Sequence, residues 1–137
     1  MTELHEIAAV PPEWTPGLKH SRYLRQLLEA RPDVADWLKT TEDRSLESGL
    51  MREFLAAEAP TDEDSLKRTL RRLRQRVMAA LIVRDISGRV SLAEVVETMT
   101  QLADVTTNFA LDFLHRQLVT QFGEPLDKLG RPQRLLI

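Results

Sequence analysis

Two consecutive amphipathic segments joined by a short turn most constrain what this chain can fold into. Over residues 61–87, apolar side chains recur every three or four positions, so they fall on one face of a helix. Gly88 follows, and glycine readily adopts the left-handed conformation that ends a helix. A second such segment covers residues 91–122, where Ser91 and Glu94 have the spacing of a capping box. The sequence therefore predicts a long antiparallel helical hairpin.

Shorter helices are expected before this hairpin, near residues 21–31, 32–39 and 45–58, from the spacing of their apolar positions. Ser21 is the expected N-cap of the first short helix, and Thr61 is the expected N-cap of the first hairpin helix. The predicted fold class is all-α, a helical bundle dominated by the long antiparallel hairpin.

The chain divides into three parts by composition. Residues 1–20 are expected to form an irregular lead, because prolines and a glycine interrupt any regular pattern there, and Trp14 is expected to anchor it. Residues 21–125 would form the helical domain. Residues 126–137 would form a linker and the start of a strand, since the chain closes on the apolar run "RLLI".

The composition excludes several classes of protein. With 42% hydrophobic and 29% charged residues, the chain is an ordinary globular protein, and its net charge of −2 gives no overall attraction to nucleic acid or to an anionic membrane. It contains no cysteine, which excludes disulfides and thiolate metal sites. No apolar run approaches the roughly 18 residues of a membrane span, and the first residues lack the pattern of a signal peptide. We therefore expect a cytoplasmic location and no membrane contact.

The chain offers few candidates for catalysis. His5, His20 and His115 are scattered, and none has a second histidine or a carboxylate at the spacing of a metal site. There is no glycine-rich phosphate loop and no nucleophile motif such as G-x-S-x-G. The residues by themselves therefore predict no catalytic residue, no cofactor-binding residue and no metal ligand.

The basic run "LKRTLRRLRQR" has two interpretations. A line of guanidinium groups could neutralise the phosphates of RNA, DNA or a nucleotide. Alternatively, the run is a solvated helix face whose arginines pair with neighbouring acidic helices. The second interpretation is favoured, because few aromatic residues lie among the arginines and the chain is net acidic. We expect four arginines to hold helices or domains together: Arg71, Arg72, Arg74 and Arg76.

Arg84 lies five helical turns after Leu66 and therefore on the same apolar face. An arginine that is always charged needs a partner when it is buried. Asp104, Asp112 or a group outside this chain could supply one. In the alternative, the helix end reaches the surface and the side chain of Arg84 extends into solvent.

The second half of the chain resembles one known family. The stretch "LRRLRQRVMAALIVRDISGRVSLAEVVETMTQLADVTTNFALDFLHRQLVTQFGEP", followed by "RPQRLLI", resembles the segment that precedes the first nucleotidyltransferase core of bacterial glutamine synthetase adenylyltransferases. One departure is the pair Ala79 and Ala80, where the family pattern suggests a further arginine. The elements that carry the resemblance are Arg71 to Arg76, Arg84 with Asp85, Leu102 to Asp104, Gly123 to Pro125, and Leu135 to Ile137.

The resemblance implies an activity for a longer parent enzyme. Such enzymes transfer AMP from ATP to glutamine synthetase and remove it by phosphorolysis, under the control of a nitrogen-signalling regulator. In the family, the strand that "RLLI" begins leads to a G-x-G-K-L-G-G loop and a Ser-Asp-x-Asp element whose carboxylates hold Mg²⁺. Neither motif occurs in these 137 residues.

We therefore expect an N-terminal, non-catalytic fragment that is inactive alone and packs against the remainder of its parent. Its implied partners are that remainder, glutamine synthetase and the regulator, while ATP and Mg²⁺ belong to the parent and nucleic acid is not expected. The rival hypothesis is a free-standing helical module that binds a protein or nucleic acid through the arginine-rich helix. Reading the gene beyond Ile137 would separate the two.

The same hypothesis makes predictions about the exposed surface. Arg134 to Ile137 should be disordered or paired with a neighbouring molecule, because a single strand start has no partner strand. Phe113, Leu114 and Leu118 are candidate contacts to the missing domain or to a second copy. Phe113 and Leu114 could equally fill the core of this chain. Leu118 distinguishes better between an external contact and a place in the core of this chain, since it lies off the main apolar stripe.

Overall fold

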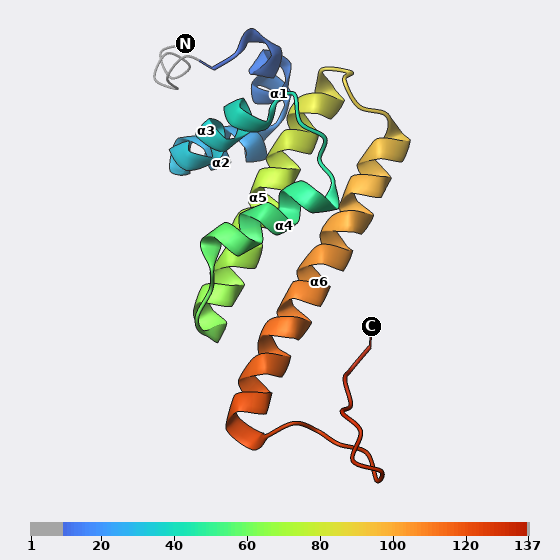
Figure 1. The fold of residues 1–137 in the computed structure, drawn as a ribbon. Coiled ribbons are helices and arrows are strands. Elements are labelled where there is room, and N and C mark those ends of the chain that lie inside the picture. The colour runs from blue at the N-terminus through green and yellow to red at the C-terminus, as the bar shows by residue number, and fades with distance from the viewer. Residues whose placement is uncertain (1–9, 137) are drawn as a thin grey trace.

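The computed structural model describes residues 10–136, and these form an all-α fold, as predicted (Figure 1). The described residues contain no strand, only an isolated antiparallel bridge between Leu126 and Pro132. The elements, in chain order, are the 3₁₀ turn η2 (Pro12–Trp14) and the helices α1 (Thr15–His20), α2 (Arg22–Ala30), α3 (Pro32–Thr41), α4 (Ser48–Glu58), α5 (Glu63–Ile86) and α6 (Leu92–Phe122).

Helix α5 is the centre of the fold. Helices α1, α2, α3 and α4 all pack against it, and α6 lies beside it and runs in the opposite direction (Figure 1). Helix α4 also packs against α6 and so closes one side of the hairpin. The hydrophobic core therefore follows one face of α5. Its most deeply buried large side chains are Trp14, Leu24, Val34, Met51, Leu55, Leu73 and Val77.

Local side-chain caps set the starts of three helices, α2, α5 and α6. The Ser21 hydroxyl accepts a hydrogen bond from the backbone N–H of Leu24 at 3.1 Å, as predicted. At the start of α6, Ser91 Oγ accepts from the N–H of Glu94 at 3.2 Å, and the Glu94 carboxylate accepts from the N–H of Ser91 at 2.8 Å. This is the predicted capping box. Gly88, with φ of +70°, makes the turn between α5 and α6.

The predicted N-cap of α5 was wrong by one residue. Asp62, not Thr61, is the cap, and its carboxylate accepts from the N–H of Ser65 at 2.7 Å. Ser65 Oγ accepts in return from the N–H of Asp62 at 3.0 Å. The Asp62 and Ser65 side chains thus form a reciprocal capping box, so α5 begins one residue later than a cap at Thr61 would imply.

The predicted irregular lead was also wrong over Pro12–His20, which is helical. Both prolines of this segment lie in the first turn of their elements, where the missing N–H has no helical partner to lose. Trp14 is only 1% exposed and anchors the segment as expected. Gly17 is buried where α1 approaches α5, and a Cβ there would lie 3.1 Å from Leu24 Cδ2. The first nine residues, including His5, lie outside the described part.

The segment after α6 turns back toward that helix (Figure 1). Asp127 organises the turn: its carboxylate accepts from the backbone N–H groups of Leu129 and Arg131. Arg134 then forms an ion pair with Asp112, near the middle of the C-terminal half of α6. Residues 134–136 form no regular element, and Ile137 lies outside the described part, so the strand start stays a prediction.

Candidate functional site

Helix α6 carries two apolar faces, and the described residues 10–136 bury only one of them. Val105 and Phe113 lie on the buried face, at 4% and 7% exposure. A second row follows the length of the helix on another face and remains accessible to solvent: Leu92, Val96, Met99, Leu114 and Leu118. An apolar face of this length on a helix is typical of a surface that packs against another element.

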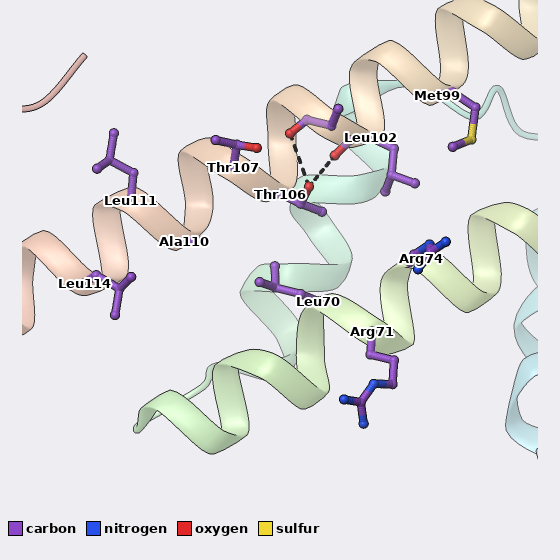
Figure 2. A pocket seen from close by; sticks show the side chains of 11 residues that line it. Leu70, Arg71, Arg74, Met99, Leu102, Thr106, Thr107, Ala110, Leu111 and Leu114 are labelled. Atoms are coloured by element: carbon purple, nitrogen blue, oxygen red, sulfur yellow. Dashed lines mark hydrogen bonds between the residues drawn. The ribbon is translucent and has the colours of Figure 1, made fainter. Parts of the chain in front are cut away.

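An open groove of about 710 Å³ lies between this second face and α5. Its floor is formed mainly by Leu70 of α5 and by Met99, Ala110 and Leu114 of α6 (Figure 2). Ala103 of α6 also lines it. The two alanines keep the floor low, because neither side chain extends beyond Cβ. The groove therefore has room for side chains of another element.

The hydroxyl of Thr106, in the same wall, does not make the groove polar. It donates to the carbonyl oxygen of Leu102 at 2.7 Å, one turn earlier in α6 (Figure 2). The hydroxyl is thus satisfied within its own helix. What the groove offers a partner is chiefly apolar contact.

Arg71 and Arg74 form a basic rim on the α5 side of the groove (Figure 2). Both are exposed, and within residues 10–136 neither forms a salt bridge. None of the described side chains that line the groove carries a carboxylate. The groove therefore combines an apolar floor with two uncompensated positive charges.

The neighbouring Arg72 and Arg76 have internal partners instead. Arg72 donates to the carboxylate of Glu58 in α4 at 2.8 Å. Arg76, which is only 6% exposed, donates to Asp33 in α3 at 2.7 Å, and its guanidinium lies 4.8 Å from the ring centroid of Phe54. These two arginines tie α5 to α3 and α4, as the structural interpretation of the basic run predicts. Their use in a contact to another domain stays a prediction.

Asp33 is the acidic partner at this junction. A hydrogen bond from Arg31 lowers the pKa of the Asp33 carboxyl well below its usual range, and the hydrogen bond from Arg76 lowers the pKa further. Burial acts against this effect but does not reverse it. Asp33 therefore stays ionised and links Arg31, which lies between α2 and α3, to Arg76 of α5.

Arg84 finds its partners in the backbone. Its Nη2 donates to the carbonyl oxygens of Thr41 at 3.0 Å, Glu42 at 3.2 Å and Arg44 at 3.0 Å. The expected carboxylate partners were wrong: Asp112 pairs with Arg134, and Asp104 is exposed. The last carbonyls of a helix lack intrahelical donors and carry the negative end of its dipole, so the end of α3 suits a guanidinium. Desolvation lowers the pKa of Arg84.

The three candidate contacts on α6 separate in the structure. Phe113 is buried in the core of this chain, whereas Leu114 and Leu118 are 38% and 54% exposed. The rest of the groove, including Met99, Ala103 and Ala110, was missed by sequence reasoning, which treated residues 91–122 as one amphipathic segment with a single apolar face. One signal in the sequence pointed to a second apolar face: the predicted helix over residues 91–122 has more apolar positions than a single helix face can hold.

The described residues hold no group of three or more His, Asp or Glu side chains placed to bind a metal ion. In the part of the chain that the structure describes, no helix is both long and apolar enough to cross a membrane.

Comparison with known proteins identifies the family. The family model of glutamate-ammonia ligase adenylyltransferase matches residues 16–137. A bifunctional glutamine synthetase adenylyltransferase/adenylyl-removing enzyme of Aromatoleum aromaticum is 40% identical over 117 residues, which are 85% of this chain and 12% of that protein. A protein of the same name from Nitrosomonas eutropha is 41% identical over 125 residues, which are 88% of this chain and 14% of that protein. Another, from Bordetella pertussis, is 33% identical over 133 residues, which are 92% of this chain and 14% of that protein.

No solved structure matches this chain. The chain spans only 12–14% of the length of these three relatives. The family model nevertheless matches residues 16–137, and the relatives match most of the chain. The chain therefore belongs to the glutamate-ammonia ligase adenylyltransferase family.

Proposed function

We propose that this chain is the N-terminal, non-catalytic helical part of a longer glutamine synthetase adenylyltransferase. The whole protein would transfer AMP from ATP to glutamine synthetase and remove it by phosphorolysis. ATP and Mg²⁺ would be bound by the polypeptide that follows this chain, not by the residues described here. The protein would act in the cytoplasm, where glutamine synthetase and a nitrogen-signalling regulator are its partners.

The observation that carries this proposal is the second apolar face of α6. A helix that is buried on one side and still presents Val96 at 57% and Leu118 at 54% exposure has a surface suited to a further element. The relatives supply a source for that element, since seven-eighths or so of their length has no counterpart in this chain. The helical hairpin would then act as a support for the nucleotidyltransferase part.

The experiment compares this chain with the full-length protein encoded by the same reading frame. Each is incubated with ATP labelled in its α-phosphate, Mg²⁺ and glutamine synthetase, and transfer of label is measured. We expect labelling by the full-length protein and none by residues 1–137, whose folding is checked by circular dichroism. Robust labelling by the short chain, or none by the full-length protein, would contradict the proposal.

The rival function, binding of nucleic acid through the arginine-rich helix, has less support. Arg72 and Arg76 are engaged with Glu58 and Asp33, which leaves fewer guanidinium groups for phosphates. A fluorescent single-stranded RNA tests this rival. Binding that weakens steeply with salt and is lost in Arg71→Ala with Arg74→Ala would favour it.

A further inference from the structure

We propose that the groove between α5 and α6 receives an acidic amphipathic helix from the polypeptide that follows this chain in the longer protein. This inference rests on the proposed function and adds the surface, the form of the occupant and its charge. Two features of the described residues carry it, the apolar floor and the basic rim, and the return of the C-terminal segment shows that a continuing polypeptide would start near α6.

The floor favours a helix as the occupant. Met99, Ala103, Ala110 and Leu114 lie on one face of α6, at intervals of four, seven and four residues. This row is about 22 Å long at 1.5 Å per residue, which a partner helix of about 15 residues would cover. The small residues at 103 and 110 allow a helix backbone to approach closely, and its apolar side chains would enter between α5 and α6.

The rim selects the charge of the occupant. Arg71 and Arg74 lie three residues apart on α5 and are therefore neighbours along one edge of the groove. Neither has a carboxylate partner within the described residues. Carboxylates spaced one turn apart on the occupant would meet both guanidinium groups in charge-assisted hydrogen bonds. An occupant with basic side chains at this edge would be repelled.

The same rim argues against a second copy of this chain in the groove. A two-fold symmetric contact places the same groove on both sides, so it brings two basic rims and no groove carboxylate into one interface. Like charges brought together in this way oppose association. The occupant must therefore come from a different segment.

The C-terminal segment brings the continuing polypeptide back to α6, on a face outside the groove. After Phe122 the chain reverses, and the ion pair between Arg134 and Asp112 holds it against α6 (Figure 1). Asp112 itself does not line the groove, because successive helix residues point about 100° apart and it faces away from Ala103 and Ala110. A continuing polypeptide would thus start beside the helix that forms the groove wall.

The experiment uses the full-length protein with the photo-cross-linking residue p-benzoylphenylalanine in place of Ala103, an exposed residue of the groove floor. The matched control carries it in place of Asn108, which is exposed on the same helix but does not line the groove. After irradiation, mass spectrometry identifies the cross-linked peptides. We expect position 103, but not position 108, to cross-link to an acidic amphipathic segment beyond Ile137.

A charge-reversal series tests the rim separately. Arg71→Glu combined with Arg74→Glu should lower the cross-linking yield at position 103 by about tenfold, because two attractive pairs become repulsive. Arg68→Glu, an exposed change on α5 outside the groove, should leave the yield within about twofold. Replacing the carboxylates of the cross-linked segment with lysine should restore the yield in the reversed variant.

Several outcomes would overturn the inference. They are cross-links from position 103 to a second copy or to a segment without carboxylates, equal yields from positions 103 and 108, and a charge reversal without effect. AMP transfer by the same full-length protein is measured in parallel. Activity with the wrong cross-links refutes the groove proposal alone, whereas absent activity with the expected cross-links refutes the proposed function alone.

Discussion

The junction of α3, α4 and α5 at Arg76 makes a prediction whose size follows from its contacts. Replacing Arg76 with alanine removes a 2.7 Å hydrogen bond to Asp33 and a guanidinium that lies over the ring of Phe54. It also removes the buried aliphatic stem of a residue that is only 6% exposed. All three contacts join α5 to other helices, so their loss should destabilise the whole fold.

The magnitude can be worked from these contacts. The hydrogen bond to Asp33, whose side chain is 47% exposed, contributes about 1 kcal/mol, since solvent screens such pairs. The cation–π contact with Phe54 contributes about 1 kcal/mol. Two buried methylene groups contribute about 1.6 kcal/mol. The substitution also removes the desolvation cost of the buried guanidinium, which offsets part of this sum. We therefore expect Arg76→Ala to lower the free energy of unfolding by about 2–3 kcal/mol.

The assay is urea unfolding of the 137-residue chain, followed by circular dichroism and by the fluorescence of Trp14 and Trp37. Arg74→Ala is the matched control on the same helix, and its exposed side chain should change the free energy of unfolding by less than about 0.5 kcal/mol. A double-mutant cycle with Phe54→Leu should give a coupling energy of about 0.5–1 kcal/mol. Equal effects of Arg76→Ala and Arg74→Ala would refute the reasoning, and zero coupling would refute the cation–π contribution.

Four further predictions follow from local features. The pKa of Asp33 is lowered in the folded chain, first by the hydrogen bond from Arg31. The resulting stabilisation is present above the pKa that Asp33 has in the unfolded chain and is lost as the pH falls toward the lower pKa of the folded chain. Acidification from about pH 5 to about pH 2.5 should therefore destabilise the wild type more than the Asp33→Asn variant in urea titrations. Ser91→Ala removes the N-cap of α6 and should cost about 1 kcal/mol, seen as a lower Tm. Gly49→Ala lies in a helix with open space around the new methyl group and should stabilise the chain by about 0.4–1 kcal/mol, measured in the same unfolding assay. The isolated chain should self-associate through the exposed end of α6, and Leu118→Glu should shift sedimentation toward monomer; a wild type that stays monomeric at high concentration would refute this.

Much of the fold could be predicted from the sequence because its signals are local. A cap depends on residues three positions apart, so Ser21 and the Ser91–Glu94 pair could be identified without knowing any tertiary contact. Gly88 marks the turn of the hairpin for the same reason. The prediction of an irregular lead failed over residues 12–20 because proline indicates a break in regular structure but does not show whether a helix starts at that break.

What only the tertiary structure decided is which partner each side chain meets. The N–H of Ser48 at the start of α4 bonds to the amide oxygen of Gln101, 53 residues away, and no local rule could supply that cap. The arginines of one continuous run divide between ion pairs with α3 and α4 and a free rim on the groove.

The apolar residues of α6 show the same limit. Periodicity identified them as apolar and helical, but it could not tell the face that packs on α4 and α5 from the face left exposed. That choice depends on where distant segments lie, and burial is a property of the packed molecule. The sequence by itself determined the helices and their ends, while the packing of α4 and α5 determined which face of α6 remains free for a partner.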